Sequence, residues 1–597
     1  MKSLKLLTEY CLISARQFSL LLKILIGFSL CIAIVFIILS VKINPVFSWG
    51  LLSLLPLTFL NIIIYQKSIL QKQIQMLRED WGKVKDKNRN FSEIEILYRN
   101  SDYNDKSKNI FIDDQTWSDL NMDEIYCDLD RTLTNPGECI LYDILRKPIL
   151  SDKILKKRNE IIRLFQINKK IREQIQIKFL SIGRQKGNGI TSLVYEKIPP
   201  SSSMRFLFSF LALLALISII TVPIFWGAPG FILLILPIYI VNLLITNKIR
   251  ARLIFQLNAI RYLGAMIRIA KKISGIDCPE IKEYCEKLKK AASEIEKIAR
   301  KTFLLFPENS VSSDFGALLY AHIDTYFMRE VRIFYSVLDE IREHKEDIRA
   351  IYSLIGELDA LQSVASYREG SSGYIEPTFS EKEIMLEIKD AIHPLLTNPV
   401  PNSINIRNKG VSITGSNMAG KTTFLRTLGI NALFAQTIYT CFASYYYGNY
   451  FRIISLINEA DNLMEGKSYY LMEAEHLLRM IKASQEEILN LCLIDEPLGG
   501  TNSSERVIAS FEILRFLFEH NALVIIATHD LELAKKLEFG FKSYHFTDDV
   551  SDKGLKFDFK LKEGITSTSN AIRLLKYLNY PEDIINQSLK KLSSESQ

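Results

Sequence analysis

The stretch GSNMAGKT, Gly415 to Thr422, decides the fold of the C-terminal part of this chain. It satisfies the pattern GxxxxGK[ST], it follows a strand-like run that ends at Thr414, and a helical pattern, TFLRTLGINALFAQ, comes directly after it. Glycines let backbone N–H groups approach phosphate oxygens, and the N-terminus of a helix adds a favourable dipole. We therefore expect a phosphate-binding loop in which Lys421 reaches the β- and γ-phosphates and Thr422 holds Mg²⁺.

Two further apolar runs end in polar residues that can take part in catalysis. ILNLCLI runs into Asp495 and Glu496, and ALVIIAT runs into His529. Ligands bind at the carboxyl ends of parallel strands, so Asp495 is expected to act on the metal and Glu496 to orient or deprotonate the attacking water. His529 is placed to sense the γ-phosphate, although a lone histidine is more often structural.

These runs alternate with helical patterns from about residue 371 onward, which predicts an α/β domain of the P-loop type with a parallel sheet covered on both faces. The expected cofactors are ATP and Mg²⁺, with Thr422 and Asp495 at the metal and Lys421, Glu496 and His529 as catalytic candidates. The predicted nucleotide-binding residues are Gly415, Ser416, Asn417, Met418, Ala419, Gly420, Lys421, Thr422 and Thr423.

The same motifs resemble those of the MutS family of mismatch-repair ATPases. The Asn-Met pair of the P-loop is typical of that family, DEPLGGTNS (Asp495 to Ser503) resembles its Asp-Glu motif, and GKSYYLMEA (Gly466 to Ala474) is similar to the loop that reaches a partner's nucleotide. The resemblance implies that Asn417 contacts phosphate and that Ser468 acts in trans. It also implies a homodimer with nucleotide between the subunits.

The resemblance extends over about residues 110–200 and 250–595. Ile112–Leu120 and Asp130–Asp152 resemble the start of the family's core domain, and Glu357–Ala365 resembles the helix that leads into its ATPase. Two features depart from the family. First, we expect no mismatch-reading domain before the core, and we interpret Phe91-Ser92-Glu93 as a chance match to the Phe-x-Glu motif of that domain. Second, Val400 lies near the position where the family has an aromatic residue that stacks on adenine.

The region before the core is apolar instead. Runs 24–41 and 46–65 contain no charged residue, and each approaches the roughly 20 residues that span a bilayer, with a turn at 42–45. A third uncharged stretch, 206–247, is about twice one span and is broken near its middle by 226–230. We predict two transmembrane hairpins.

Buried helices of a large soluble core are the alternative, because they too are apolar all round. A cleaved signal peptide fits poorly, since the first run is long and another span follows it at once. Lys and Arg flank the outer ends of both hairpins, which by the positive-inside rule predicts a multi-pass protein of a bacterial-type inner (plasma) membrane with its ATPase domain in the cytoplasm. These residues are Lys2, Lys5, Arg16, Lys23, Lys67, Lys72, Arg205, Lys248, Arg250 and Arg252.

The net charge of +7 does not decide whether nucleic acid is bound, because juxtamembrane Lys and Arg account for much of the excess. DNA is thus a possible partner that the sequence does not show. The eight cysteines are scattered and are expected to be free thiols.

The predicted function is a membrane-anchored MutS-like ATPase whose cycle at a dimer interface moves helical levers. A mismatch-binding repair protein is the alternative, and a transport ATPase is a second one that the absence of ionisable residues from the spans disfavours. The predicted divisions are a first hairpin (1–72), a charged linker (73–109), a first core part (110–200), a second hairpin (204–250), a helical lever region (251–370), the ATPase domain (371–560) and a C-terminal helical segment (561–597).

Overall fold

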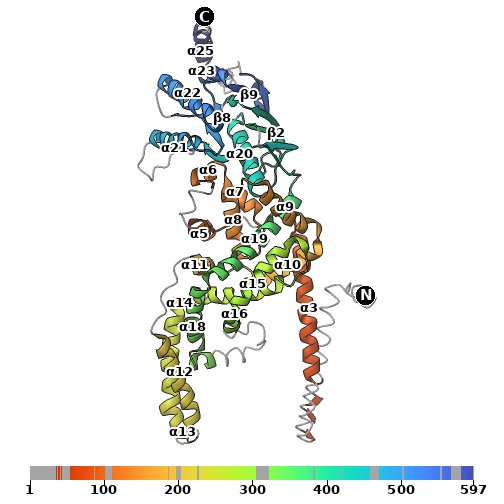
Figure 1. Ribbon diagram of the computed structural model, residues 1–597, viewed down its shortest axis with the longest axis vertical. Coiled ribbons are helices and arrows are strands. Elements are labelled where there is room, and N and C mark those ends of the chain that lie inside the picture. The colour runs from red at the N-terminus through yellow and green to blue at the C-terminus, as the bar shows by residue number, and fades with distance from the viewer. Residues whose placement is uncertain are drawn as a thin grey trace, which may run out of the picture.

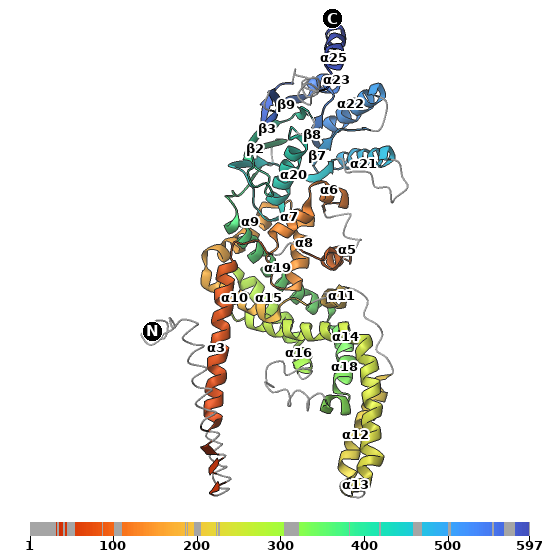
Figure 2. The same cartoon turned by 180° about the vertical axis from the view of Figure 1, so that it is seen from behind.

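The protein is elongated, with the C-terminal sheet domain at one end, a helical core in the middle and two apolar legs at the other end (Figures 1 and 2). The computed structural model describes residues 54–85, 88–100, 110–185, 187, 189–195, 204–222, 224, 227–303, 322–380, 383–416, 419–457, 469–499, 503–551, 554–565 and 580–595, with residues 32, 35, 36, 38, 39, 42 and 43.

The main sheet of the C-terminal domain has six strands in the order β10-β9-β4-β8-β7-β6. Five of them are parallel, and β10 pairs antiparallel with β9 at the edge, so the sheet is mixed where a parallel one was predicted. The three predicted strands lie next to one another at its centre. The strands are β4 (Gly410–Thr414), β6 (Arg452–Leu456), β7 (Asn490–Asp495), β8 (Ala522–Thr528), β9 (Phe541–Ser551) and β10 (Gly554–Glu563).

Helices cover both faces of this sheet, because alternate strand residues point to opposite sides. Leu491 and Leu493 of β7 join the large core on the side of α20, whereas Cys492 and Ile494 join the cluster formed with α21 and α22. This explains why β7 is an unbroken apolar run. The helices are α20 (Lys421–Thr437), α21 (Tyr469–Ser484), α22 (Ser503–Glu519) and α23 (Leu531–Lys536), followed by the 3-10 turn η7 (Leu537–Phe539).

A second sheet of four strands, in the order β1-β5-β2-β3, lies between the main sheet and the helical core. Strand β10, which contacts β3 of this second sheet, continues to Glu563, a few residues past the predicted boundary at 560. The described C-terminal helix α25 spans Glu582–Glu595. The strands of the second sheet are β1 (Thr378–Phe379), β2 (Met385–Ala391), β3 (Asn402–Arg407) and β5 (Tyr445–Gly448).

The helical core is organised around α19 (Lys345–Gly370), which runs from the lever region into the sheet domain. Its predicted apolar face is buried, with Leu358, Leu361 and Ala365 fully covered. Around it lie α6 (Asp114–Asp119), α7 (Met122–Leu129), α8 (Asn135–Arg146), α9 (Asp152–Ile167), α10 (Lys169–Ile182), α11 (Gly189–Tyr195), η6 (Pro279–Ile281), α15 (Lys282–Glu294), α16 (Glu296–Phe303) and α18 (Arg329–Glu343).

Helices α8 and α19 cross closely because glycine faces the contact on both sides. A Cβ at Gly137 would lie 2.1 Å from Asp359 Oδ2, and one at Gly356 would lie 2.6 Å from the carbonyl oxygen of Pro136. Thr134 caps α8 by accepting from the N–H of Gly137, and its own N–H and hydroxyl donate to Asp359. The Thr-x-x-Gly turn thus joins the two halves of the core.

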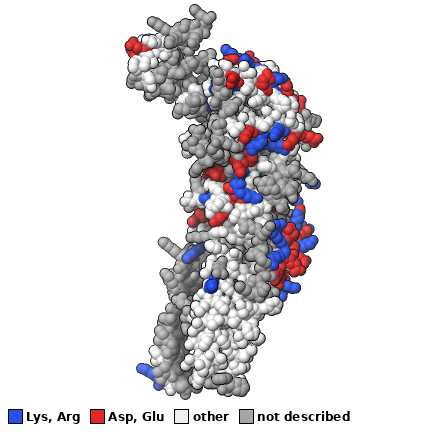
Figure 3. Space-filling view, turned by 90° about the vertical axis from the view of Figure 1, so that its left-hand side faces the viewer, with Lys and Arg blue, Asp and Glu red and all other residues white. Residues whose placement is uncertain are grey.

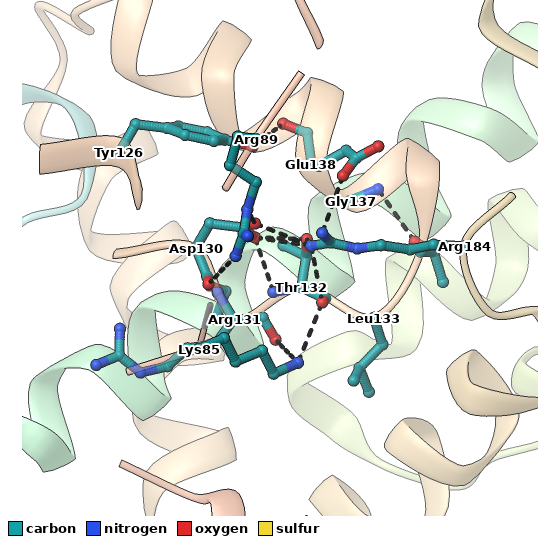
Figure 4. Close-up of polar contacts among 12 residues, drawn as sticks. Lys85, Arg89, Tyr126, Asp130, Arg131, Thr132, Leu133, Gly137, Glu138 and Arg184 are labelled. Carbon is teal, nitrogen blue, oxygen red and sulfur yellow. Dashed lines mark hydrogen bonds and ion pairs between the residues drawn. The ribbon is translucent and has the colours of Figure 1, made fainter. Parts of the chain in front are cut away.

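A buried charge network ties the segment after the first leg to this core (Figure 4). The carboxylate of Asp130 accepts from Arg89 at 2.7 Å and from Arg184 at 2.9 Å. Burial by itself would raise the pKa of Asp130, but these two guanidinium groups outweigh it and hold the pKa well below its usual range. Lys85 donates to the carbonyl oxygens of Arg131 and Thr132 in the same network.

The first leg is α3 (Leu54–Asp80), whose last turns dock on the core. Arg78 pairs with Glu173 of α10 at 2.6 Å, and the N–H of Gly82 donates to Ser366 of α19. Most of the first predicted span, 24–41, and the start of the second lie outside the described residues. The short helices α4 (Phe91–Ile94) and α5 (Ile96–Asn100) follow, and Phe91 packs against Tyr126, which fits the interpretation of Phe-x-Glu as chance.

The second leg is a pair of helices that turns back at α13 (Gly227–Gly230), where the sequence predicted a break. It consists of α12 (Met204–Thr221), the π-helical turn η5 (Phe231–Ile235) and the start of α14 (Leu236–Ile273). Figure 3 shows a lower surface almost free of charged side chains. Among the described residues, two stretches are long and apolar enough to cross a membrane. Phe231–Ile249 has 11% of its apolar window buried, whereas Leu253–Ile273 has 56% buried and belongs largely to the core.

A segment distant in sequence packs against this second leg. Tyr326 shares a hydrogen bond with Ser218 at 2.7 Å and accepts one from Asn242 at its backbone oxygen, and His322 contacts the hydroxyl of Tyr239. Residues 206–247 include no Asp, Glu, Lys or Arg, but Asp324 is buried in this neighbouring segment. The apolar hairpin therefore has a polar inner face that its own sequence does not reveal.

Candidate functional site

The predicted phosphate-binding loop connects β4 to α20, so the expected order of strand, glycine turn and helix is present. Gly415 and Gly420 have φ values of 145° and 106°, which side chains rarely adopt. A Cβ at Gly415 would also come within 2.9 Å of the carbonyl oxygen of Phe546. Ala419 is fully buried, and Asn417 and Met418 lie outside the described residues. Both glycines are thus required by backbone conformation or close approach.

Lys421 is buried and turned back onto the loop. Its Nζ donates to the carbonyl oxygens of Gly415 at 2.7 Å and Ser416 at 3.1 Å, and it lies 4.0 Å from Glu496 Oε1. A buried ammonium needs such acceptors when no phosphate is bound. The same donors are available to phosphate oxygens once the side chain swings away from the carbonyls.

The metal candidates Thr422 and Asp495 are in direct contact. The Thr422 hydroxyl donates to Asp495 Oδ2 at 2.6 Å. Burial raises the pKa of Asp495, and the Thr422 hydrogen bond and Lys421 oppose that shift. A hydroxyl and one carboxylate, completed by phosphate oxygens and water, form the ligand set that Mg²⁺ favours in nucleotide sites. Within the described part of the chain, no group of three or more His, Cys, Asp or Glu could hold a metal by itself.

Glu496 and His529 form a pair beside the loop. Glu496 has φ 50°, so its side chain leaves β7 in an unusual direction. Its Oε1 accepts from the backbone N–H of His529 at 2.9 Å and lies 2.7 Å from His529 Nδ1. The imidazole is half exposed and Glu496 is mostly covered. The structure therefore brings Lys421, Thr422, Asp495, Glu496 and His529 to one edge of the sheet.

A cavity of about 480 Å³, within the range of small-molecule sites, is lined by Lys421, Thr422, Asp495 and Glu496. His529 contacts this site through Glu496. The far end of the cavity is lined by residues of the second sheet and of β10. Val400 is there, as predicted, but so are His393 and Phe559. Burial lowers the pKa of His393 to about 4, so its imidazole is neutral at physiological pH.

Phe559 is the residue that sequence reasoning missed. It has φ 51° and lies at a register shift in the pairing of β10 with β9. Asn402 holds this bulge: its Nδ2 donates to the backbone oxygen of Phe559 at 2.9 Å, and its Oδ1 accepts from the N–H of Leu561 at 2.8 Å. The half-exposed ring is thereby presented to the cavity, a position suited to stacking on a base. The local sequence KFDFKLKE contains no signal for the bulge.

The predicted trans contact, Ser468, lies outside the described residues, as does the rest of 458–468. Helix α21 begins one residue later, at Tyr469. The assignment of Ser468 therefore stays a prediction.

Comparison with known proteins agrees with this geometry. Residues 411–595 match the family model of MutS domain V. The chain is similar to the DNA mismatch repair proteins MutS of Thermotoga maritima (30% identity over 272 residues), Thermus thermophilus (28% over 270 residues) and Thermus aquaticus (29% over 261 residues). These alignments cover 44%, 45% and 43% of this chain and 34%, 33% and 31% of the relatives. The similarity thus spans about a third of the length of each relative.

Proposed function

Since this chain belongs to the MutS family through its C-terminal domain, we propose that it is a membrane-anchored ATPase that binds and hydrolyses MgATP. The observation that carries the proposal is the convergence of Lys421, Thr422, Asp495 and Glu496 on one cavity, with His529 paired to Glu496. Each of these side chains has a partner that phosphate, metal or water can replace.

The proposed chemistry follows from the contacts of these side chains. Lys421 exchanges the carbonyl oxygens of Gly415 and Ser416 for β- and γ-phosphate oxygens. Glu496 accepts a proton from, or orients, the attacking water, and His529 keeps the carboxylate aimed while facing the γ-phosphate. Thr422 and Asp495 would hold Mg²⁺, and the ion would neutralise phosphate charge there. Phe559 and Val400 cover the base.

A substitution of Glu496 tests this function. The purified full-length chain should release phosphate from ATP, and Glu496→Ala should abolish release while ATP binding persists, because the residue acts on water and not on phosphate. Glu532→Ala, at an exposed carboxylate of α23 that pairs only with Lys536 in the described contacts, is the matched control. Phosphate release by Glu496→Ala at the wild-type rate would refute the assignment.

Membrane attachment is supported by two legs that project from the same end of the molecule, opposite the ATPase domain (Figures 1 and 3). The outer surface of the second leg exposes large apolar side chains such as Phe210, Leu233 and Leu244. Exposed apolar surface on this scale is typical of contact with lipid or another protein. We place the chain in a bacterial-type inner membrane with the ATPase domain in the cytoplasm. Extraction of native membranes at alkaline pH should leave the chain in the pellet, and its release into the supernatant would exclude this placement.

We propose further that nucleotide lies between two subunits and that hydrolysis moves the helical levers. Support comes from α19, which is continuous from the lever region to the sheet domain. Its Arg368 donates to the backbone oxygens of Ile438 and Tyr439 just after the P-loop helix. Light scattering of the Glu496→Ala variant should show dimers that accumulate with ATP and disperse without it. A mass that does not change with nucleotide would exclude the dimer cycle.

The second candidate is mismatch repair, which the names of the relatives favour. The alignments cover about a third of each of those proteins, and DNA binding by this chain is not implied by such a partial match. Titration of the chain with matched and mismatched duplexes at two salt concentrations separates the candidates. A preference for the mismatch would establish the second one.

A further inference from the structure

The turn that carries Glu496 is conformationally strained. Glu496 and Leu498, both non-glycine residues, have φ values of 50° and 58°. Such left-handed conformations are uncommon for side chains of this size and persist only where the surroundings hold them. The position of the Glu496 carboxylate therefore depends on what holds the turn.

Three neighbouring elements contact this turn. From β8, the carbonyl oxygen of Ala527 accepts from the N–H of Glu496 at 3.0 Å. From α22, the hydroxyl of Ser510 donates to the carbonyl oxygen of Pro497 at 3.3 Å. From α21, the carboxylate of Glu473 accepts from the N–H of Gly499 at 3.3 Å. Glu473 is the only ionisable side chain among these three contacts.

Glu473 is an unusual residue for its place. It is only 3% exposed, and burial raises its pKa while hydrogen bonds from the backbone of Gly499 and Leu498 oppose the shift. Burying a carboxylate costs free energy unless it accepts hydrogen bonds. A buried glutamate one turn into α21 therefore suggests a specific role. Its donors are the backbone N–H groups of Leu498 and Gly499, two and three residues after Glu496.

We infer that Glu473 is a positioning residue that holds the Pro497–Gly499 turn and thereby sets the position of the Glu496 carboxylate for hydrolysis. Glu473 does not line the cavity, so it acts through Glu496 and not on the nucleotide. Leu498 adds an apolar contact between the turn and α21, since its buried side chain belongs to the same cluster as Leu477 and Met480. A shift of α21 is consequently passed to the catalytic carboxylate. This inference rests on the proposed ATPase function.

The test compares variants of the full-length chain in steady-state hydrolysis. Glu473→Ala should lower kcat about 10- to 100-fold, because small misplacements of a reacting group have effects of that order, while KM for ATP stays nearly unchanged. Glu473→Gln keeps an acceptor oxygen for Gly499 and should retain most of the wild-type kcat. Glu475→Ala, at an exposed acid on the same helix, is the matched control and should leave kcat unchanged.

Each outcome decides the inference. Wild-type kcat in Glu473→Ala overturns it, since the turn then keeps its position without the carboxylate. Equal losses in Glu473→Ala and Glu473→Gln, accompanied by a higher KM and a lower melting temperature in both, indicate a purely structural role and also overturn it. If the wild-type chain itself does not hydrolyse ATP, the proposed function fails and the inference fails with it. Wild-type hydrolysis with an inactive Glu496→Ala shows that the function stands independently.

Discussion

Removal of the Thr422 hydroxyl gives the most direct measure of the metal site. Thr422→Ala deletes a 2.6 Å hydrogen bond to the Asp495 carboxylate and also the proposed Mg²⁺ ligand. A hydrogen bond to a charged group contributes about 1.5–3 kcal/mol. Since about 1.4 kcal/mol corresponds to a factor of ten, kcat/KM for MgATP should fall about 10- to 100-fold, and the Mg²⁺ concentration needed for half-maximal rate should rise.

The direction of the pH effect follows from the same contact. The Thr422 hydrogen bond opposes the burial that raises the pKa of Asp495, so the pKa should rise further in the variant. Only the ionised carboxylate holds the metal, and activity of the variant should therefore recover partly as pH increases. The assay is phosphate release as a function of free Mg²⁺ at several pH values.

Two variants on the same helix make the result interpretable. Thr422→Ser keeps the hydroxyl and should behave like the wild type. Thr437→Val removes a buried hydroxyl that donates to the carbonyl oxygen of Leu433, far from the cavity, and controls for general damage to α20. An unchanged Mg²⁺ dependence in Thr422→Ala would refute the reasoning, as would an equal loss in Thr437→Val.

Three further predictions concern the base end of the cavity and the buried network. Phe559→Ala should raise KM for ATP about 2- to 10-fold at constant kcat, because ring stacking contributes about 0.5–1.5 kcal/mol; steady-state kinetics with an unchanged KM would exclude stacking. Asp130→Asn removes the buried carboxylate that pairs with both Arg89 and Arg184 and should destabilise the core by about 3–5 kcal/mol, measured by thermal unfolding, where a wild-type midpoint would contradict the prediction. Burial raises the pKa of Glu138 to about 7 from its ordinary 4.5, so the stability contributed by its neutral form is present below pH 4.5 and is lost as pH rises through about 7. Glu138→Gln should flatten this part of the pH–stability curve, and an unchanged slope would show that another group titrates.

The sequence predicted which residues meet at one edge of the sheet because its signals are local. A strand, a glycine turn and a helix follow one another within a few residues around Gly415, and β7 and β8 are unbroken apolar runs that end directly at Glu496 and His529. Parallel pairing then brings these ends together without further information. The edges of elements were less predictable, as the extension of β10 past residue 560 shows.

The features that were missed depend on contacts between distant residues. The bulge that presents Phe559 is held by Asn402, 157 residues earlier, and the polar face of the second leg is formed by Tyr326, 84 residues after Asn242. The absence of charge from the spans was used against transport, yet Asp324 is buried beside them. No periodicity within a helix can indicate which remote segment will cover it.

The interruption of the core by the second leg also constrains the order in which the molecule can assemble. Thr134 and its partner Asp359 are 225 residues apart, and α12 and the apolar start of α14 are synthesised between them. A ribosome therefore releases the leg while the apolar faces of α8 still lack α19, and closing so long a loop is slow. Early capture of the leg by a bilayer would remove the most aggregation-prone segment during this interval.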